Sequence, residues 1–367
     1  MSGAEQLIVD RELLGSWKTA RDGTGELAEW HTGTGSHDGA HHDLDADLAE
    51  RPIDPPDRAL RRGMTTDDPL FFIYTSGTTG FPKAARFTHG KFLLGAGALP
   101  NMLGITRDDR MYVALPLYHT AGGVMALGGP LLHGAGVVLT RKFSASRFWD
   151  ECVEHDATMF QYIGELCRYL VNSPPHPLER SHRLRIAIGN GLRPDVWPRF
   201  QARFRIDRII EFYGATEGNT TLFNLDNKVG SIGRMPTRLA RAAGLRLVEY
   251  DVESDDVRRD ASGRCTEVGN DTPGEAIARI TRATPFDGYS DPEATERKIL
   301  RDVFRKGDAY FRTGDLLSHD RDGYWYFIDR IGDSFRWKGE NVSTTEVAHV
   351  LGECDGVLEA NVYGVEV

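Results

Sequence analysis

The stretch Thr75-Ser76-Gly77-Thr78-Thr79-Gly80-Phe81-Pro82-Lys83 decides how the rest of this chain is interpreted. Glycines let a backbone approach a polyphosphate closely, and consecutive N–H groups can form an anion-binding nest. Lys83 supplies a mobile positive charge. Hydroxyl donors are added by Thr75, Ser76, Thr78 and Thr79. The spacing Gly77-x-x-Gly80-x-x-Lys83 is not that of a Walker A loop. An ordinary Gly/Thr turn is the weaker alternative for so specific a nonamer, so we predict a phosphate-binding loop.

On either side of this loop, the hydrophobic pattern divides the chain into two parts, one before and one after about residue 67. It has 367 residues with 40% hydrophobic and 27% charged content, which is typical of a globular protein of one large or two ordinary domains. Residues 1–67 show weak periodicity, and 33–47 are rich in His, Gly and Asp, so we expect a loop or linker there. From Asp68 onward, short apolar runs alternate with amphipathic stretches. This alternation predicts an α/β fold with a mainly parallel sheet covered by helices.

The expected elements follow from these runs. Strands are expected at 71–74, 111–115, 137–139, 158–162, 185–188 and 209–213. Helices are expected at 91–102, 124–132, 146–155, 166–172 and 194–204, the last with Pro194 in its first turn. After about Gly230 the pattern changes to β, with strands at 245–252 and 275–280 and a hairpin whose turn is 320–323. A helix at 344–351 and a strand at 357–365 complete the expectation.

Charge and cysteine content exclude several classes of protein. The net charge is -10, which argues against a sequence-independent nucleic-acid binder and requires local donors for any anionic ligand. The four cysteines are widely spaced without a CxxC pair, so we expect neither a disulfide framework nor a zinc site, and a reducing cytoplasm is the simpler location. No signal peptide is evident. The apolar window 122–139 contains six glycines, and we expect a buried helix and strand there instead of a membrane span.

The segment YTSGTTGFPKAA, residues 74–85, resembles the phosphate-loop signature of the adenylate-forming superfamily, which includes acyl-CoA synthetases, luciferases and peptide synthetase adenylation domains. Further stretches resemble its later motifs in the required order: 116–122, 189–192, 213–217, 310–315, and Asp329-Arg330 with 338–342. The resemblance implies the superfamily's large domain, with parallel sheets layered with helices plus a small β subdomain. We expect a remnant of the N-terminal part at 1–67, the AMP-binding core at 68–330 and the start of a C-terminal subdomain at 331–367.

Three stretches point to one branch of the superfamily: 162–169, 288–292 and 335–342. They look like the fatty acid transport protein and very-long-chain acyl-CoA synthetase group, in a bacterial form. This implies ATP-dependent activation of a long- or very-long-chain fatty acid, first to acyl-AMP and then to acyl-CoA. ATP, Mg²⁺ and CoA are the implied cofactors and co-substrates. Contact with the inner face of the plasma membrane, coupled to fatty acid uptake, stays open, and the oligomeric state cannot be read from the sequence.

The resemblance assigns catalytic roles to Glu217, Thr216 and Lys83. Glu217 follows a strand end, and a carboxylate there suits Mg²⁺, although in isolation it would be interpreted as a solvated surface residue. Thr216 is expected to donate to the α-phosphate. Lys83 and the loop, whose cofactor-binding residues run from Thr75 to Gly80, are expected to hold the β- and γ-phosphates.

Nucleoside contacts are implied by the later motifs. Tyr213 offers an aromatic face to adenine, with a core tyrosine as the alternative. Asp315 is expected to accept from the ribose hydroxyls or to form an Asx turn. Arg330 is expected to contact the ribose or to pair with Asp329 on the surface. The other cofactor-binding residues implied are Gly189, Asn190, Gly191, Gly214 and Ala215.

The acyl substrate is assigned to Tyr118, His119, Tyr162 and Gly164. We expect His119 to position the acyl group, because a packed histidine is more common than a catalytic base. Beyond the hinge, Arg336 and Lys338 either face CoA phosphates or belong to a solvated charged face.

Two other classes of function stay open. The superfamily carries a sizeable N-terminal portion before the loop and a late catalytic lysine, and little of either is visible here. One alternative is therefore a catalytically incomplete fragment that binds a nucleotide or acyl-adenylate. The other is a carrier-protein-dependent adenylation domain, against which the stretches near Tyr162 and Gly288 favour CoA.

Overall fold

The computed structural model describes residues 4–21, 27–34, 42–75, 82–333, 335–337, 340–352, 354, 356–357 and 360–365. The chain forms two compact units, Met1–Thr65 and Thr66–Val367. Of the helices in the described ranges, none has the length and apolar content needed to cross a bilayer.

The first unit is built on a small parallel sheet in the order β1-β2-β3. Its strands are β1 (Gln6–Asp10), β2 (Ala28–Thr32) and β3 (His42–Asp43), accompanied by η1 (Arg11–Leu13), α1 (Leu14–Ala20), α2 (Leu44–Ala49) and η2 (Arg58–Arg61). The expected loop at 33–47 is wrong for its second half. His42–Asp43 pairs with Trp30–His31, and the Asp43 carboxylate caps α2 by accepting from the Ala46 N–H at 3.1 Å.

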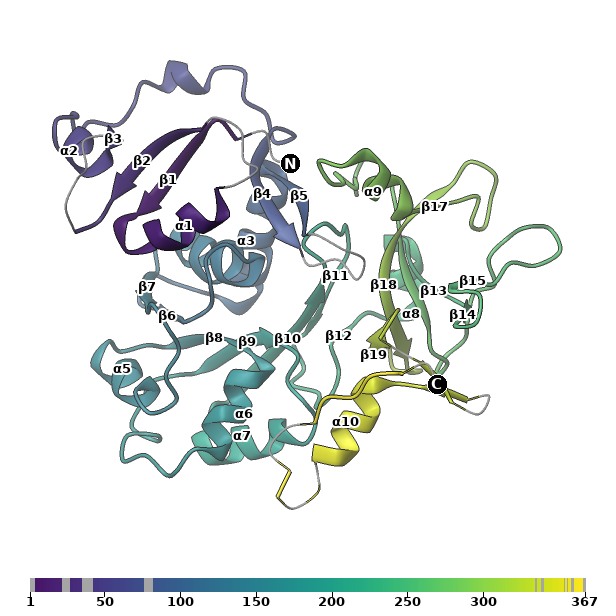
Figure 1. The fold of residues 1–367 in the computed structure, drawn as a ribbon. Coiled ribbons are helices and arrows are strands. Elements are labelled where there is room, and N and C mark those ends of the chain that lie inside the picture. Colours follow the sequence, from purple (N-terminus) through teal and green to yellow (C-terminus); the bar gives the residue numbers. More distant parts are fainter. Residues whose placement is uncertain are drawn as a thin grey trace. The chain divides into compact units, whose positions relative to one another are not determined.

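The second unit contains the expected parallel sheet, in the order β11-β10-β9-β8-β6-β7 (Figure 1). β10 and β11 pair antiparallel, and the other neighbours are parallel. The strands are β6 (Arg110–Val113), β7 (Gly136–Leu139), β8 (Met159–Ile163), β9 (Ile186–Asn190), β10 (Arg208–Gly214) and β11 (Thr221–Asn224). Nearly continuous burial along β8, β9 and β10 is what a sheet covered on both faces requires.

Helices cover the two faces of this sheet, with α3 on one side and α6 and α7 on the other (Figure 1). The first face packs Met111, Met159 and Ile188 against Leu99 and its neighbours. The opposite face packs Phe160 and Tyr162 against Trp149, Cys167 and Trp197. The covering helices are α3 (His89–Leu103), the π-helix η3 (Thr120–Gly128), α4 (Gly129–His133), α5 (Phe148–Glu154), α6 (Gly164–Asn172) and α7 (Val196–Phe204).

A second, antiparallel sheet forms the β-rich part, in the order β12-β19-β18-β16-β13, with β17 paired to β18. Its strands are β12 (Gly233–Arg234), β13 (Leu245–Val248), β16 (Gly274–Arg279), β17 (Ile299–Arg301), β18 (Ala309–His319) and β19 (Tyr324–Arg330). The expected hairpin is confirmed, because the Asp320 carboxylate accepts from the N–H groups of Asp322 and Tyr324. Together the two sheets confirm the expected fold class.

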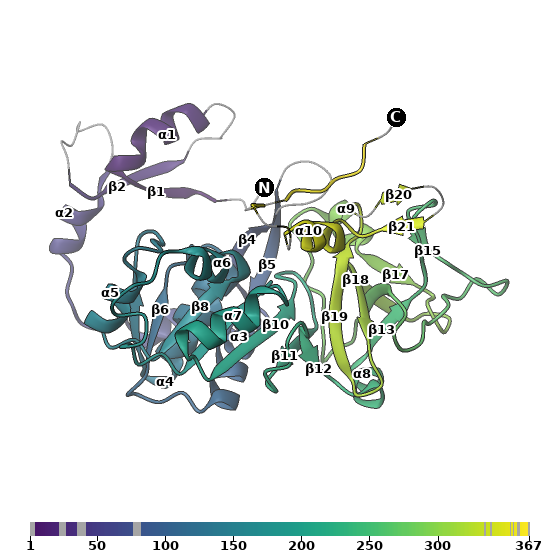
Figure 2. The same cartoon turned by 90° about the horizontal axis from the view of Figure 1, so that it is seen from below.

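Shorter elements complete the unit. They are β4 (Pro69–Thr75), β5 (Lys83–Thr88), α8 (Thr237–Ala243), β14 (Tyr250–Asp251), β15 (Asp256–Val257), α9 (Pro292–Arg297), β20 (Phe335–Trp337), β21 (Glu340–Val342) and α10 (Thr344–Gly352). β4 lies outside the parallel sheet and forms an antiparallel pair with β5. The Asp329 carboxylate accepts from the Thr344 N–H at 2.6 Å and places α10 beside β19 (Figure 2).

Four expected elements need correction. The helix at 124–132 is a π-helix that begins at Thr120 and continues into α4. α7 begins at Val196, after Pro194. The strand at 245–252 divides into β13 and β14. The strand expected at 357–365 is wrong, because its described residues, 357 and 360–365, have no strand pairing.

Candidate active site

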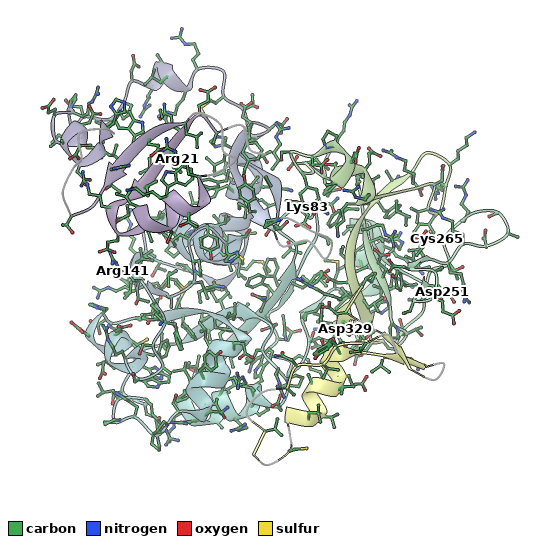
Figure 3. The ribbon with its side chains drawn as sticks, viewed as in Figure 1. Arg21, Lys83, Arg141, Asp251, Cys265 and Asp329 are labelled. Carbon is green, nitrogen blue, oxygen red and sulfur yellow. The ribbon has the colours of Figure 1, made fainter. Side chains whose placement is uncertain are left out.

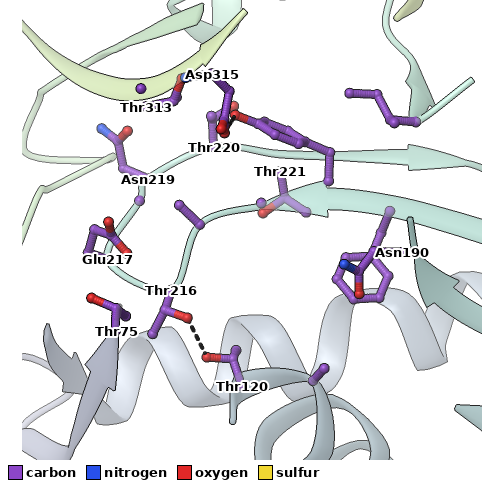
Figure 4. Close-up of a pocket in the computed structure, with 18 of the residues that line it drawn as sticks. Thr75, Thr120, Asn190, Thr216, Glu217, Asn219, Thr220, Thr221, Thr313 and Asp315 are labelled. Carbon is purple, nitrogen blue, oxygen red and sulfur yellow. Dashed lines mark hydrogen bonds between the residues drawn. The ribbon is translucent and has the colours of Figure 1, made fainter. Parts of the chain in front are cut away.

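A cleft of about 1950 Å³ lies in the second unit and collects most of the predicted site residues. Figure 4 shows Thr75, Asn190, Thr216, Glu217 and Asp315 around it. The predicted residues that line the cleft are Thr75, Lys83, His119, Asn190, Gly191, Tyr213, Gly214, Ala215, Thr216, Glu217, Asp315 and Arg330. They come from strand ends and loops that lie far apart in the sequence, which is typical of ligand sites in α/β folds.

Glu217 is held in place from two sides. The Tyr289 hydroxyl donates to its Oε1 at 2.7 Å, and Lys91 Nζ donates to its backbone carbonyl at 3.0 Å. Lys91 also pairs with Asp287 at 3.2 Å. Burial lowers the pKa of Lys91, and the Asp287 charge opposes that shift. The surroundings therefore fix the backbone and the carboxylate of Glu217 separately.

A divalent cation at Glu217 would need ligands beyond the protein. In the described ranges, no three His, Cys, Asp or Glu side chains gather as a metal site. Mg²⁺ is commonly bound by one or two carboxylates together with substrate phosphates and water. Glu217 in an open cleft, near Lys83, fits that kind of site.

Thr216 contacts η3. Its Oγ1 lies 2.9 Å from Thr120 Oγ1, and Figure 4 shows this hydrogen bond. π-Helices frequently occur at functional sites. Gly122 and Gly123 make this one possible, because a Cβ on them would lie 2.4 Å and 2.2 Å from the carbonyl oxygens of Pro116 and Leu117.

Asp315 and Tyr213 lie together in the lining of the cleft. The Tyr213 hydroxyl donates to Asp315 Oδ2 at 2.6 Å, and Arg330 Nε lies 3.6 Å from Oδ1. Burial raises the pKa of Asp315. The hydrogen bond from Tyr213 and the charges of Arg330 and Lys298 oppose this shift. The backbone N–H of Asp315 donates to Thr313 Oγ1 at 3.1 Å, which fixes the turn. An acceptor with cations beside it is thus directed into the cleft.

The loop after β9 is supported from beneath by Glu211. This buried carboxyl accepts from the Tyr162 hydroxyl at 2.6 Å and from the Leu192 N–H at 3.0 Å. Burial raises the pKa of Glu211 to about 8. Sequence reasoning missed Glu211, although its position two residues before Tyr213 on a buried strand was a usable signal.

Two of the acyl-binding assignments, Tyr162 and Gly164, and one cofactor-binding assignment, Gly189, need correction. Tyr162 is fully buried on Glu211 and does not line the cleft. Gly164 and Gly189 also lie outside the lining, because they are packed against backbone. A Cβ on Gly164 would lie 1.7 Å from the Gly191 carbonyl oxygen, and one on Gly189 would lie 2.3 Å from that of Tyr162. Gly164 therefore packs against the loop after β9, and Tyr162 contacts the Glu211 carboxyl that supports this loop.

His119 lines the cleft, whereas Tyr118 does not. Tyr118 is 72% exposed, and its ring centroid lies 4.5 Å from that of His119. The cleft lining also contains Leu94, Ala98 and Met125, which contribute apolar surface.

The ends of the phosphate loop are described, and its centre is not. Ser76, Gly77, Thr78, Thr79 and Gly80 lie outside the described residues, as do Lys338 and Gly339 of the hinge motif. Thr75 ends β4 and Lys83 begins β5. Lys83, which is labelled in Figure 3, has its Nζ 5.8 Å from the ring centroid of Tyr289. The two cleft-lining ends of the loop thus flank the side of the site that holds Glu217.

The comparisons with known proteins agree with this geometry. Residues 6–263 match the family model described as AMP-binding enzyme. The chain belongs to the AMP-binding enzyme family. It is 45% identical over 369 residues to human long-chain fatty acid transport protein 3, covering 100% of this chain and 54% of that protein. It is 49% identical over 315 residues to rat long-chain fatty acid transport protein 2, covering 86% of this chain and 51% of that protein.

This AMP-binding enzyme spans about half the length of the curated relatives it matches. Two solved structures share its fold. An anthranilate CoA ligase bound to anthranoyl-AMP has a TM-score of 0.79 at 23% identity, with 99% of this chain and 66% of that chain covered. ATP-bound MatB from Rhodopseudomonas palustris has a TM-score of 0.75 at 23% identity, with 98% of this chain and 66% of that chain covered.

Proposed function

We propose that this chain is the nucleotide- and acyl-binding core of an ATP-dependent, AMP-forming long-chain fatty acid–CoA ligase. The observation that carries the proposal is the convergence of Lys83, Thr216, Glu217, Tyr213 and Asp315 on one cleft. Its support is threefold: the site geometry, the curated relatives named as long-chain fatty acid transport proteins, and fold relatives whose names state ATP and an acyl-adenylate as ligands.

The first step would join the fatty carboxylate to the α-phosphorus of ATP and release pyrophosphate. Lys83 would neutralise the β- and γ-phosphate oxygens, and Thr216 would donate to the α-phosphate. Mg²⁺, when bound, supplies charge neutralisation at the phosphates. Glu217 would be its protein ligand. Asp315 would accept from the ribose hydroxyls, and Tyr213 would stack on adenine. Positioning and electrostatic stabilisation would be the protein's main contributions.

The second step would transfer the acyl group to CoA. The CoA thiolate attacks the acyl carbonyl carbon, the C–O bond to phosphate breaks, and AMP leaves with the electron pair. We assign the fatty acyl group to the side of the cleft with His119, where Leu94 and Met125 give apolar contact. CoA as acceptor is supported by the fold relatives named as CoA ligases.

We also propose a location and an origin. The enzyme would act in the cytoplasm or at the inner face of the plasma membrane, in a bacterium. The support for membrane contact is the word transport in the names of the curated relatives. The support for the cytoplasm is the lack of a CxxC pair among its cysteines, of which the described ones are free.

Product analysis tests this proposal. The 367-residue chain is incubated with palmitate, ATP, Mg²⁺ and CoA, and its products are separated by liquid chromatography and mass spectrometry. We expect AMP, pyrophosphate and palmitoyl-CoA in equal amounts. Release of ADP and phosphate would contradict the proposal. A tight complex with palmitoyl-AMP without turnover would favour the incomplete binding module, and transfer to a holo-carrier protein instead of CoA would favour the carrier-dependent class.

A further inference from the structure

Lys298 is a half-buried cation in the lining of the cleft that sequence reasoning did not single out. It directly follows α9 and lines the cleft together with Glu217, Thr313 and Asp315. Its backbone is fixed on both sides, because its N–H donates to the Thr295 carbonyl and its carbonyl accepts from the Arg312 N–H at 2.8 Å. The side chain therefore extends from a rigid base.

The ammonium group has spare hydrogen-bonding capacity. Nζ donates to the Thr313 carbonyl at 3.3 Å, and an ammonium has three N–H donors. Nζ also packs against the backbone beside Asp315, because a Cβ on Gly314 would lie only 3.2 Å from it. The lack of a side chain at position 314 thus leaves room for the ammonium group.

The carboxylates around Lys298 are bound to other groups. Glu275 forms a bidentate pair with Arg312, at 2.7 Å from Nη2 and 3.0 Å from Nε. Asp315 accepts from Tyr213, and Glu217 accepts from Tyr289. Burial lowers the pKa of Lys298. The negative charges of Glu217, Glu275 and Asp315 oppose that shift, and the positive charge of Lys83 adds to it. An anion entering the cleft would restore the favourable environment of this cation.

We propose that Lys298 binds the phosphate that is attached to the ribose, which is the α-phosphate of ATP and the phosphate of acyl-AMP. This inference rests on the proposed function, because it uses Asp315 as the ribose site and Glu217 as the metal site. The α-phosphate would connect the ribose to the metal-bound phosphates. Lys298 lines the same cleft as Glu217 and Asp315, and its Nζ donates to the Thr313 carbonyl, two residues before Asp315. Its role differs from that of Lys83, which begins β5 at the end of the phosphate loop.

Binding of AMP and of adenosine, measured separately by isothermal titration calorimetry, tests this assignment. The variants are Lys298→Met, Lys298→Arg and the control Lys306→Met, whose lysine is exposed and outside the cleft lining. We expect Lys298→Met to weaken AMP binding by roughly 10- to 100-fold, the range for a lost hydrogen bond to a charged group, with adenosine affinity unchanged. Lys298→Arg should recover part of the AMP affinity, and Lys306→Met should behave as the wild type.

Each other outcome has a defined meaning. Equal AMP affinity in Lys298→Met and the wild type would overturn the inference. Parallel losses for AMP and adenosine would also overturn it, because they would make Lys298 a structural residue. A wild-type protein that binds neither molecule would instead overturn the proposed function.

Discussion

The Tyr289 hydroxyl donates a 2.7 Å hydrogen bond to Oε1 of Glu217 and so joins two residues that lie 72 positions apart. Burial, followed by the charge of Glu217, raises the pKa of Tyr289, so the hydroxyl stays protonated as a donor. The contact leaves the carboxylate facing the cleft in a fixed orientation, which a metal ligand requires.

Tyr289→Phe should lower the affinity for the Mg²⁺ that supports nucleotide binding. The variant keeps the ring and loses the hydrogen bond, so we expect about 10-fold more Mg²⁺ to be needed for half-maximal ATP binding. The Mg²⁺ titration is followed by calorimetry or fluorescence. Tyr169→Phe is the matched control, because Tyr169 is an exposed residue outside the cleft lining. Identical Mg²⁺ titrations for Tyr289→Phe and the wild type would show that this hydrogen bond does not position Glu217.

Tyr213→Phe should shift the pH dependence of adenosine binding. Ionised Asp315 is the stronger acceptor for the ribose hydroxyls, so affinity should fall as the pH drops through its pKa. Burial raises that pKa, and the charged or titratable groups that act on it are Tyr213, Arg330, Lys298 and Glu217. Without the Tyr213 hydroxyl, which lowers the pKa, the loss should begin at a higher pH. Adenosine titrations between about pH 5 and 8 measure this, and superimposable profiles would contradict it.

Glu211→Gln should remove a pH-dependent part of the stability. The pKa of Glu211 is raised from its ordinary value of 4.5 to about 8 in the folded protein. Between these values the unfolded state loses the proton that the folded state keeps, so this group's contribution is present at low pH and declines as the pH rises. The slope can reach about 1.4 kcal/mol per pH unit. The Tm of the variant minus that of the wild type should therefore increase up to about pH 8. Parallel Tm curves would disprove this contribution.

Gly164→Ala should destabilise the loop after β9, which contains Gly191. The new Cβ would overlap the Gly191 carbonyl oxygen, so the loop or α6 must move. We expect a loss of about 1–3 kcal/mol in the free energy of unfolding, measured with urea, and weaker adenosine binding. Gly269→Ala is the matched control, because a Cβ there meets nothing within 4 Å. Similar losses in both variants would mean that the close approach of Gly164 and Gly191 carries no special cost.

The elements that could be predicted from the sequence are those whose burial is continuous or regularly spaced. Runs such as Arg185–Ile188 and Ile209–Tyr213 predict buried parallel strands. β9 begins one residue after the start of the first run, and β10 includes the whole second run. The amphipathic patterns of α6 and α7 likewise locate those helices. The strand expected at 357–365 failed because a strand also needs a paired neighbour, which an apolar pattern does not guarantee.

The site was predictable only where one motif carries the chemistry. Thr216, Glu217 and Asp315 belong to recognisable motifs, whereas Lys91 and Lys298 do not. Their importance arises from contacts with residues distant in the sequence, such as Lys91 with Glu217 across 126 positions. Tyr162 was assigned to the substrate by resemblance, but the strand alternation places it with Phe160 in the core.

Fatty-acid-dependent exchange of labelled pyrophosphate into ATP, compared between the wild type and Glu217→Ala, tests the adenylation mechanism most directly. The account predicts exchange that requires palmitate and Mg²⁺ in the wild type. It predicts a loss of about 100-fold or more in Glu217→Ala, since a group that stabilises developing charge is removed. Exchange at the wild-type rate in Glu217→Ala would contradict the role of Glu217, and no palmitate-dependent exchange in the wild type would contradict adenylation by this chain.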